Sequence, residues 1–150
     1  MTHAEKAVAL FKEGYNCSQS VFLAFEDMYE MDHAMAVRLS SGFGAGMGKL
    51  REVCGALTGA FMAASILYGY EDITDTEEKK RVYAMIQQIA ARFEEERGTI
   101  ICRELLGLKK GEDLEEPAVR TEEYYTSRPC AALCGLAAQA LDEYIREHAL

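Results

Sequence analysis

The side chains of this sequence best suited to chemistry belong to its five cysteines. They are Cys17, Cys54, Cys102, Cys130 and Cys134. A thiolate is both a nucleophile and a metal ligand, so a cysteine becomes reactive where its surroundings favour the ionised form. A single cysteine also serves as a small buried hydrophobic residue. Five cysteines in 150 residues exceed what packing usually requires, so the group as a whole points to a function.

Four of the cysteines fall in the first turn of a predicted helix: Cys17, Cys54, Cys102 and Cys130. Unpaired N–H groups there carry the positive end of the helix dipole and favour a thiolate over a thiol. Arg51 and Arg103 lie next to two of these positions in the sequence and would lower the thiol pKa further. If the four helix starts meet at one end of a bundle, they form a cysteine-rich, electropositive pocket.

The spacing of the cysteines does not identify their chemistry. Cys134 lies one turn beyond Cys130 and faces the same side of its helix, a spacing that fits metal binding and core packing equally. No Cys-x-x-Cys is present, so neither a thioredoxin site nor a zinc ribbon is indicated. Cysteines that are distant in sequence can still converge in the fold, which leaves redox, metal-binding and packing roles open.

The element expected to position these residues is a buried central helix over residues 52–70. The run from Val53 to Tyr70 contains no charged residue, and Gly55, Gly59 and Ala63 recur at a four-residue spacing that lets other helices approach closely. A run of this length raises the question of a membrane span. Polar residues dilute it, and a helix that is apolar all round is equally expected inside a soluble bundle. We therefore predict a bundle of about five to seven helices.

The remaining sequence predicts a single all-α domain over residues 1–150, because it has two prolines and almost no alternating pattern. The other expected helices are 3–12, 17–29, 33–41, 76–97, a short one at 99–107 with Thr99 as its cap, and 127–148 with Ser127 as its cap. Residues 109–120 are expected to form a loop, and 122–126 are assigned to no element. The glycine-rich stretch 42–49 lacks the strand and the hydroxyl of a phosphate-binding loop.

The overall charge limits the partners. A net charge of −9 and a pI near 4.9 argue against nucleic acid, whose phosphates would be repelled. The N-terminal segment is charged and amphipathic and lacks the apolar core of a signal peptide. We therefore expect a cytoplasmic protein, in which structural disulfides are rare and cysteines are more often catalytic, redox-active or metal-binding.

Several segments together resemble the C_GCAxxG_C_C family, a group of small helical proteins to which a redox activity is attributed. The segments are 16–21 (NCSQSV), 42–48 (GFGAGMG), 52–60 (EVCGALTGA), 102–107 (CRELLG) and Cys130. The resemblance implies that Cys17, Cys54, Cys102 and Cys130 correspond to the family's four cysteines. Cys134 is then an addition, or it takes the fourth position in place of Cys130. The resemblance also implies an association with membrane transporters, but it supplies no reaction.

Three functions follow from these residues. In the first, Cys54 is the low-pKa thiol beside Arg51, and Cys17, Cys102 or Cys130 resolves it as a disulfide. In the second, the same four thiolates bind zinc or an iron–sulfur cluster. In the third, the cysteines only pack, and the protein is a non-catalytic helical interaction module. The cofactor is accordingly open between none, zinc and a cluster.

The expected partner is a redox protein or a small thiol, and a homodimer is also open. Three methionines, Met28, Met31 and Met35, are expected to fill gaps in the core or to form such a dimer contact. The three histidines, His3, His33 and His148, lie at helix ends and are expected to be solvated rather than to bind a ligand.

Overall fold

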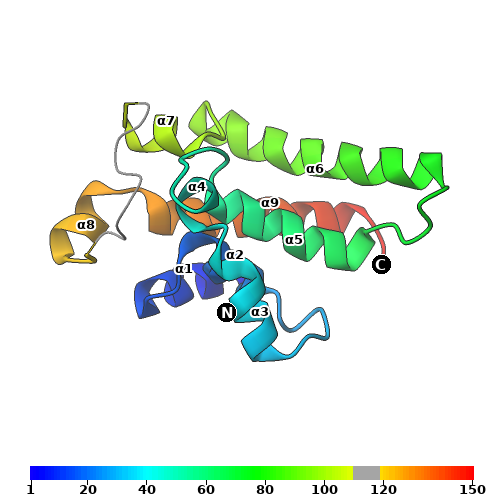
Figure 1. Ribbon diagram of the computed structural model, residues 1–150, viewed down its shortest axis with the longest axis horizontal. Coiled ribbons are helices and arrows are strands. Elements are labelled where there is room, and N and C mark those ends of the chain that lie inside the picture. Colours follow the sequence, from blue (N-terminus) through cyan, green and yellow to red (C-terminus); the bar gives the residue numbers. More distant parts are fainter. Residues whose placement is uncertain (110–118) are drawn as a thin grey trace.

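The computed structural model describes residues 1–109 and 119–150, with the side chains of residues 126 and 127 left aside. Within these ranges the chain forms nine helical segments and no β-strand, which confirms the all-α class (Figure 1). The segments are α1 (His3–Glu13), α2 (Cys17–Ala24), α3 (His33–Ser41), α4 (Gly44–Met47), α5 (Gly55–Tyr68), α6 (Thr76–Arg97), α7 (Cys102–Leu106), α8 (Glu122–Ser127) and α9 (Cys130–Glu147). Most of the loop expected at 109–120 lies outside the described residues.

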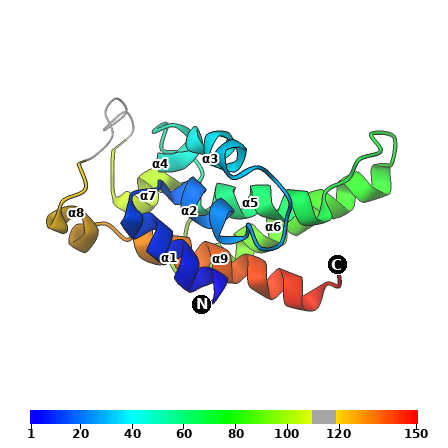
Figure 2. The same ribbon diagram turned by 90° about the horizontal axis from the view of Figure 1, so that it is seen from below.

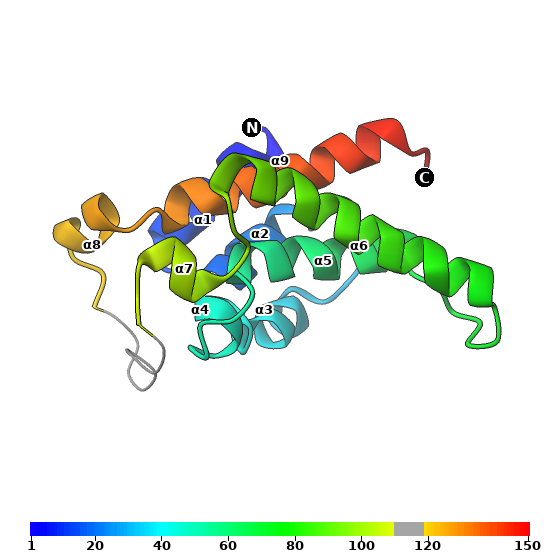
Figure 3. The same cartoon turned by 90° about the horizontal axis from the view of Figure 1, so that it is seen from above.

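The helices pack around a centre shared by α2, α5 and α9. Helix α1 runs along α9, and α6 lies along both α5 and α9 (Figures 1 and 3). In Figure 2, α3 and α4 lie on one side of α2, and α1 and α9 lie on the other. The starts of α5, α7 and α9 gather at one end of the molecule, beside α4 and α8 (Figures 1 and 3).

All seven expected helices are present, and side-chain caps set several of their boundaries. Thr2, Asn16, Asp32 and Asp75 each accept a backbone N–H at a helix start, a contact worth about 1 kcal/mol. Outside the central helix, three boundaries differ from expectation by two residues or more. Helix α2 ends at Ala24 instead of near residue 29, the N-cap of α7 is residue 101 instead of residue 99, and that of α9 is residue 129 instead of residue 127.

The expected central helix is present as α5, over Gly55–Tyr68 instead of residues 52–70. Its first expected residues are extended, because Val53 pairs with Ile101 in an isolated antiparallel bridge. One face of α5 is buried, whereas Ser65 and Ile66 on the other face are exposed. The helix therefore buries one face and not its whole circumference. No helix in the described ranges combines the length and the apolar character needed to cross a bilayer.

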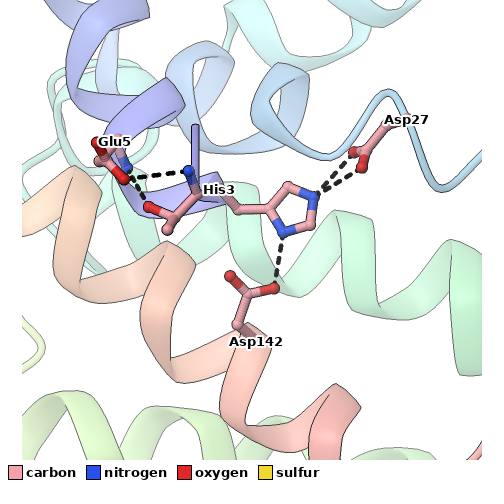
Figure 4. Close-up of polar contacts among 5 residues, drawn as sticks. His3, Glu5, Asp27 and Asp142 are labelled. Carbon is pink, nitrogen blue, oxygen red and sulfur yellow. Dashed lines mark hydrogen bonds and ion pairs between the residues drawn. The ribbon is translucent and has the colours of Figure 1, made fainter.

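His3 ties three parts of the bundle together (Figure 4). Its Nδ1 lies 2.7 Å from Asp142 Oδ1 on α9, and its Nε2 lies 2.9 Å from Asp27 Oδ1, between α2 and α3. The ring also stacks on Phe25 with the ring centres 4.1 Å apart. The expectation that this histidine is solvated was therefore wrong, whereas the His33 side chain is 59% exposed.

Candidate functional site

A cavity of about 360 Å³ lies at the end of the bundle where α2, α5, α7 and α9 begin. Four cysteines line it: Cys17, Cys54, Cys102 and Cys130. Cys134 is fully buried on α9 and lies outside the lining. All five cysteines carry free thiols. Residues that are up to 113 positions apart in the sequence thus face one space.

The start of α2 fixes Cys17. Asn16 and Gln19 form a capping box, in which Gln19 N–H donates to Asn16 Oδ1 over 2.9 Å and Asn16 N–H donates to Gln19 Oε1 over 3.0 Å. Asn16 Nδ2 also donates to the Ser41 carbonyl and ties α2 to the end of α3. Cys17 is therefore the first residue of α2, and its Sγ accepts the Ala45 N–H over 3.3 Å.

A short antiparallel pairing places Cys54 and Cys102. On either side of the Val53–Ile101 bridge, Cys54 N–H donates to the residue 100 carbonyl over 2.8 Å, and Cys102 N–H donates to the residue 52 carbonyl over 2.6 Å. Alternate residues of a paired segment share a face, so Cys54 and Cys102 lie on the same face of this pairing. Because a single bridge is too short to produce an alternating apolar pattern, this pairing was not predicted from the sequence.

The glycine-rich turn adopts a left-handed backbone conformation. Positive φ angles occur at Gly46 and Gly48 and also at four residues with side chains: Ala45 (56°), Met47 (71°), Lys49 (66°) and Arg51 (60°). The left-handed conformation costs a non-glycine residue roughly 1–2 kcal/mol. Backbone strain of this kind is concentrated at functional sites in proteins.

This turn supplies hydrogen-bond donors to two of the sulfur atoms. Its Ala45 N–H reaches Cys17, and Arg51 Nη1 lies 3.5 Å from Cys102 Sγ. Arg51 therefore contacts Cys102, a thiol 51 residues further along the chain. A Cβ built on Gly46 would lie 2.6 Å from the Cys102 Cβ, so this close approach requires glycine.

The two glycines of the Cys-Gly-Ala-x-x-Gly segment let α5 approach the start of α2. A Cβ on Gly55 would lie 2.4 Å from Cys17 Sγ, and one on Gly59 would lie 2.5 Å from the Ser18 carbonyl oxygen. Real Cβ atoms essentially never approach a neighbour so closely. The spacing of the two glycines is therefore explained by contact with the start of α2. Gly55 makes room for the Cys17 thiol, and Gly59 makes room for the backbone of Ser18.

Burial dominates the ionisation of Cys54. The residue is 5% exposed, and burial raises its pKa well above the usual value. The N–H groups of Leu57 and Ala56 at the start of α5 oppose this effect but are weaker. The expectation that Cys54 is the low-pKa thiol was wrong, because desolvation outweighs the helix N-terminus. Cys54 also lies at the N-cap of α5, one residue before its first turn.

Burial is also the largest influence on the pKa values of Cys17, Cys130 and Cys134. Burial raises the pKa of Cys17, while the Ala45 N–H acts in the opposite direction. Burial also raises the pKa of Cys130 to about 11, with the charge on Cys17 as the next contribution, and Arg128 opposes this shift. For Cys134 the pKa lies well above its usual value, again through burial and then through Cys17.

The structure adds basic and aromatic residues that sequence analysis did not single out. Three further cations line the cavity, Lys49, Arg120 and Arg128, together with the aromatic rings of Phe11 and Tyr124. Arg103, which we expected to act on a thiol, lies outside the lining. Its Nη1 donates to the Arg51 carbonyl over 3.2 Å.

The described residues do not fit a preformed metal site. Within residues 1–109 and 119–150, no group of three or more His, Cys, Asp or Glu side chains lies close enough together to hold an ion. The four thiols thus share one cavity without surrounding a common point. The zinc and iron–sulfur alternatives for Cys17, Cys54, Cys102 and Cys130 consequently find no ligand set in this conformation.

The fold and the cavity define a small helical protein with clustered thiols. The family model described as "Putative redox-active protein (C_GCAxxG_C_C)" matches residues 15–144. The chain belongs to this family, which confirms the resemblance seen in the sequence. A search of curated proteins and a search of solved structures each found no match.

Proposed function

We propose that the protein is a thiol–disulfide exchange protein, in which Cys17 and Cys102 alternate between two thiols and one disulfide. The observation that carries this proposal is the gathering of four thiols from separate elements around one cavity. Cys17 interacts electrostatically with other thiols of the group. Among the thiols, its charge makes the largest contribution to the raised pKa of both Cys54 and Cys130.

Cys102 is the proposed attacking thiol because Arg51 Nη1 lies 3.5 Å from its sulfur. A guanidinium in this position stabilises the negative charge that the sulfur carries when it attacks a disulfide. Cys17 is the proposed resolving thiol, since its partly buried side chain lines the same cavity and its pKa responds to the charge on Cys102. Cys54 and Cys130 line the same cavity but take no part in the proposed exchange.

The reaction requires a disulfide substrate, written R–S–S–R. The Cys102 thiolate attacks one sulfur, the S–S bond breaks, and one R–S⁻ leaves with the electron pair. Cys17 next attacks the Cys102 sulfur of the mixed disulfide and releases the second R–S⁻. The two protons of the protein thiols pass to the two leaving groups. The protein thus loses two electrons to form one disulfide, and R–S–S–R is reduced to two R–SH.

The test counts thiols by mass after alkylation, before and after mild oxidation. We expect wild-type protein to lose two alkylatable thiols and to regain both on reduction. Cys17→Ala and Cys102→Ala should abolish this reversible loss. Cys134→Ala is the matched control, because Cys134 is buried beside Cys17 and lies outside the cavity lining.

Circular dichroism would verify that each variant is folded before its thiols are counted. Retention of the reversible loss in Cys17→Ala, or its absence in wild-type protein, would overturn the proposal.

A further inference from the structure

The walls of the thiol cavity are mainly apolar. Besides the four thiols, its lining contains two aromatic and three aliphatic side chains: Phe11, Tyr124, Leu105, Leu106 and Leu133. Sites for small molecules are typically lined by hydrophobic and aromatic side chains with a few polar groups, and a volume of about 360 Å³ lies within their range. The cavity therefore has the size and the walls of a site for a small apolar molecule.

The helices carry thiols and apolar side chains on the same faces. On α7, Leu105 and Leu106 follow Cys102 by three and four residues, so all three side chains lie on one side of the helix. On α9, Leu133 follows Cys130 by three residues in the same way. A ligand that reaches the Cys102 sulfur would therefore also contact the two leucines of α7.

Two aromatic rings add a further apolar surface to the lining. The Phe11 and Tyr124 rings are stacked, with their centres 6.4 Å apart and their planes inclined by 20°. Phe11 is 2% exposed whereas Tyr124 is half-buried, so Tyr124 is the ring that presents surface to a ligand. Burial also raises the pKa of Tyr124 to about 12, so its phenol carries no charge at neutral pH.

The basic side chains of the lining are engaged within the protein. Arg120 donates to the Phe11 and Tyr15 carbonyls, and its guanidinium lies 4.1 Å from the centre of the Phe11 ring. The other three cations also have interaction partners in the protein: Lys49, Arg51 and Arg128. A negatively charged ligand would therefore compete with these partners, and no aspartate or glutamate of the described lining would pair with a positively charged one. Because an ion leaves water at a high cost unless its charge is compensated, the cavity favours an uncharged ligand.

We propose that the cavity binds a low-molecular-weight disulfide with uncharged, apolar substituents, which packs on Leu105, Leu106 and Tyr124 while its S–S bond meets the Cys102 sulfur. This inference rests on the proposed exchange function and names its substrate class. Cys102 is 7% exposed, so a disulfide must enter the cavity to reach its sulfur. A disulfide fixed in the surface of a folded protein cannot enter in this way, whereas a small molecule can.

The test uses disulfides that share one leaving group and differ in the other substituent. Alkyl 2-pyridyl disulfides with methyl, ethyl, propyl and butyl groups vary the apolar size, and the 2-aminoethyl and 2-carboxyethyl compounds add a positive or a negative charge. The Cys102 thiolate attacks the alkyl-bearing sulfur, the S–S bond breaks, and pyridine-2-thione leaves with the electron pair and takes up a proton. Cys17 then attacks the Cys102 sulfur and releases the alkyl thiol, which takes up the second proton.

The rate constant for release of pyridine-2-thione reports the first step. Each rate constant is divided by that of the same probe with the denatured protein, which removes the intrinsic reactivity. For the reduced, folded protein we expect this normalised rate constant to rise about twofold to fourfold with each added methylene group. The propyl probe should also react about tenfold or more faster than the two charged probes of similar length, because their charges lose hydration in the cavity.

Leu105→Ala and Leu106→Ala should each weaken the dependence on alkyl length, with the butyl probe slowed several-fold and the methyl probe little changed. Leu136→Ala is the matched control, because Leu136 is a half-buried leucine on α9 outside the thiol cavity. This variant should keep the wild-type dependence on alkyl length. Two variants of the cavity are used, each checked by circular dichroism, so that a folding defect in one of them leaves the test intact.

A binding measurement separates this inference from the exchange function. The thioether 2-(propylsulfanylmethyl)pyridine replaces one sulfur of the propyl probe with a methylene group and cannot exchange. It should shift the amide NMR signals of residues 102–106 in wild-type protein and shift them less in Leu106→Ala. Equal normalised rate constants for all probes, or no shifts, would overturn the inference and leave the exchange function standing. Failure of every probe to release its alkyl thiol would overturn the exchange function itself.

Discussion

The thiol cavity and the His3 contact are two places where reactive side chains from different elements meet, yet they differ in their surroundings. At the cavity, four thiols and four cations face a space of about 360 Å³. At His3, the imidazole is held between Asp27 and Asp142 and stacked on Phe25, and it does not line the thiol cavity.

The difference shows that a cluster of titratable groups is not in itself a site. The partners of His3 use both ring nitrogens, and the Asp27 side chain is 57% exposed, so this contact fits a clamp between helices. The sulfur atoms of Cys17 and Cys102 each accept a hydrogen bond and also border open volume. Space for a second molecule beside partly stabilised sulfur atoms is what makes the cavity the better candidate for chemistry.

The largest expected effect comes from filling the space beside Cys17. In Gly55→Ala, the new Cβ would lie 2.4 Å from Cys17 Sγ, so the sulfur must move. We expect a loss of about 1–3 kcal/mol in the free energy of unfolding, as is typical of overpacking. We also expect disulfide exchange at least about tenfold slower, which is a loss of roughly 1.4 kcal/mol in transition-state stabilisation. Urea denaturation and stopped-flow kinetics would measure the two effects.

Gly59→Ala is the matched control for this change. Its Cβ would meet the Ser18 carbonyl oxygen, not a sulfur. This variant should lose stability too, but at a temperature where it stays folded its exchange rate should equal that of wild-type protein. Equal exchange rates in both glycine variants would show that the space beside Cys17 does not affect disulfide exchange. The thiol cavity would then differ less from the His3 contact than we expect.

An intermediate effect is expected from alkaline pH. The Cys130 pKa is raised from its usual 9.0 to about 11 in the folded protein, so between these values the unfolded thiol ionises while the folded one stays protonated. The contribution of Cys130 to the free energy of unfolding is therefore fully present below pH 9 and decreases as the pH rises towards 11. The free energy of unfolding, measured by denaturation at pH 8, 9 and 10, should decrease less steeply with pH in Cys130→Ala than in wild-type protein. Identical slopes would show that the thiol is not desolvated.

The smallest effect is expected at the His3 clamp. His3→Ala removes the contacts with Asp27 and Asp142 and the stack on Phe25, and it should cost about 1 kcal/mol of stability. His33→Ala removes an exposed contact with Glu26 and should cost less than about 0.5 kcal/mol. Neither variant should alter disulfide exchange. A large loss of exchange in His3→Ala would mean that the clamp acts on the cavity.

Local signals were sufficient to predict the helices and the positions of most cysteines on them. Asn16 caps α2 through its own side chain, and this fixes Cys17 as the first helical residue. Cys102 and Cys130 lie in the first turns of α7 and α9, as expected, although these helices begin later than their predicted caps. These features depend on a few neighbouring residues, so they can be read from the sequence without the tertiary structure.

The features that depend on burial and on distant contacts could not be predicted in this way. The helix start at Cys54 suggested a lowered pKa, but the direction of the shift is set by desolvation, which only the packed structure reveals. Arg51 contacts Cys102 through a bridge that joins two separate segments. Arg120 reaches the cavity because Phe11 on α1 and Tyr15 just after this helix provide carbonyl acceptors, more than 100 residues earlier in the chain.

The most direct test of the exchange mechanism is to identify the disulfide that forms under mild oxidation. Wild-type protein would be oxidised, its remaining thiols blocked, and its peptides separated without reduction and identified by mass spectrometry. We predict a bond between Cys17 and Cys102. A bond that involves Cys134, or five unmodified thiols after oxidation, would contradict the account.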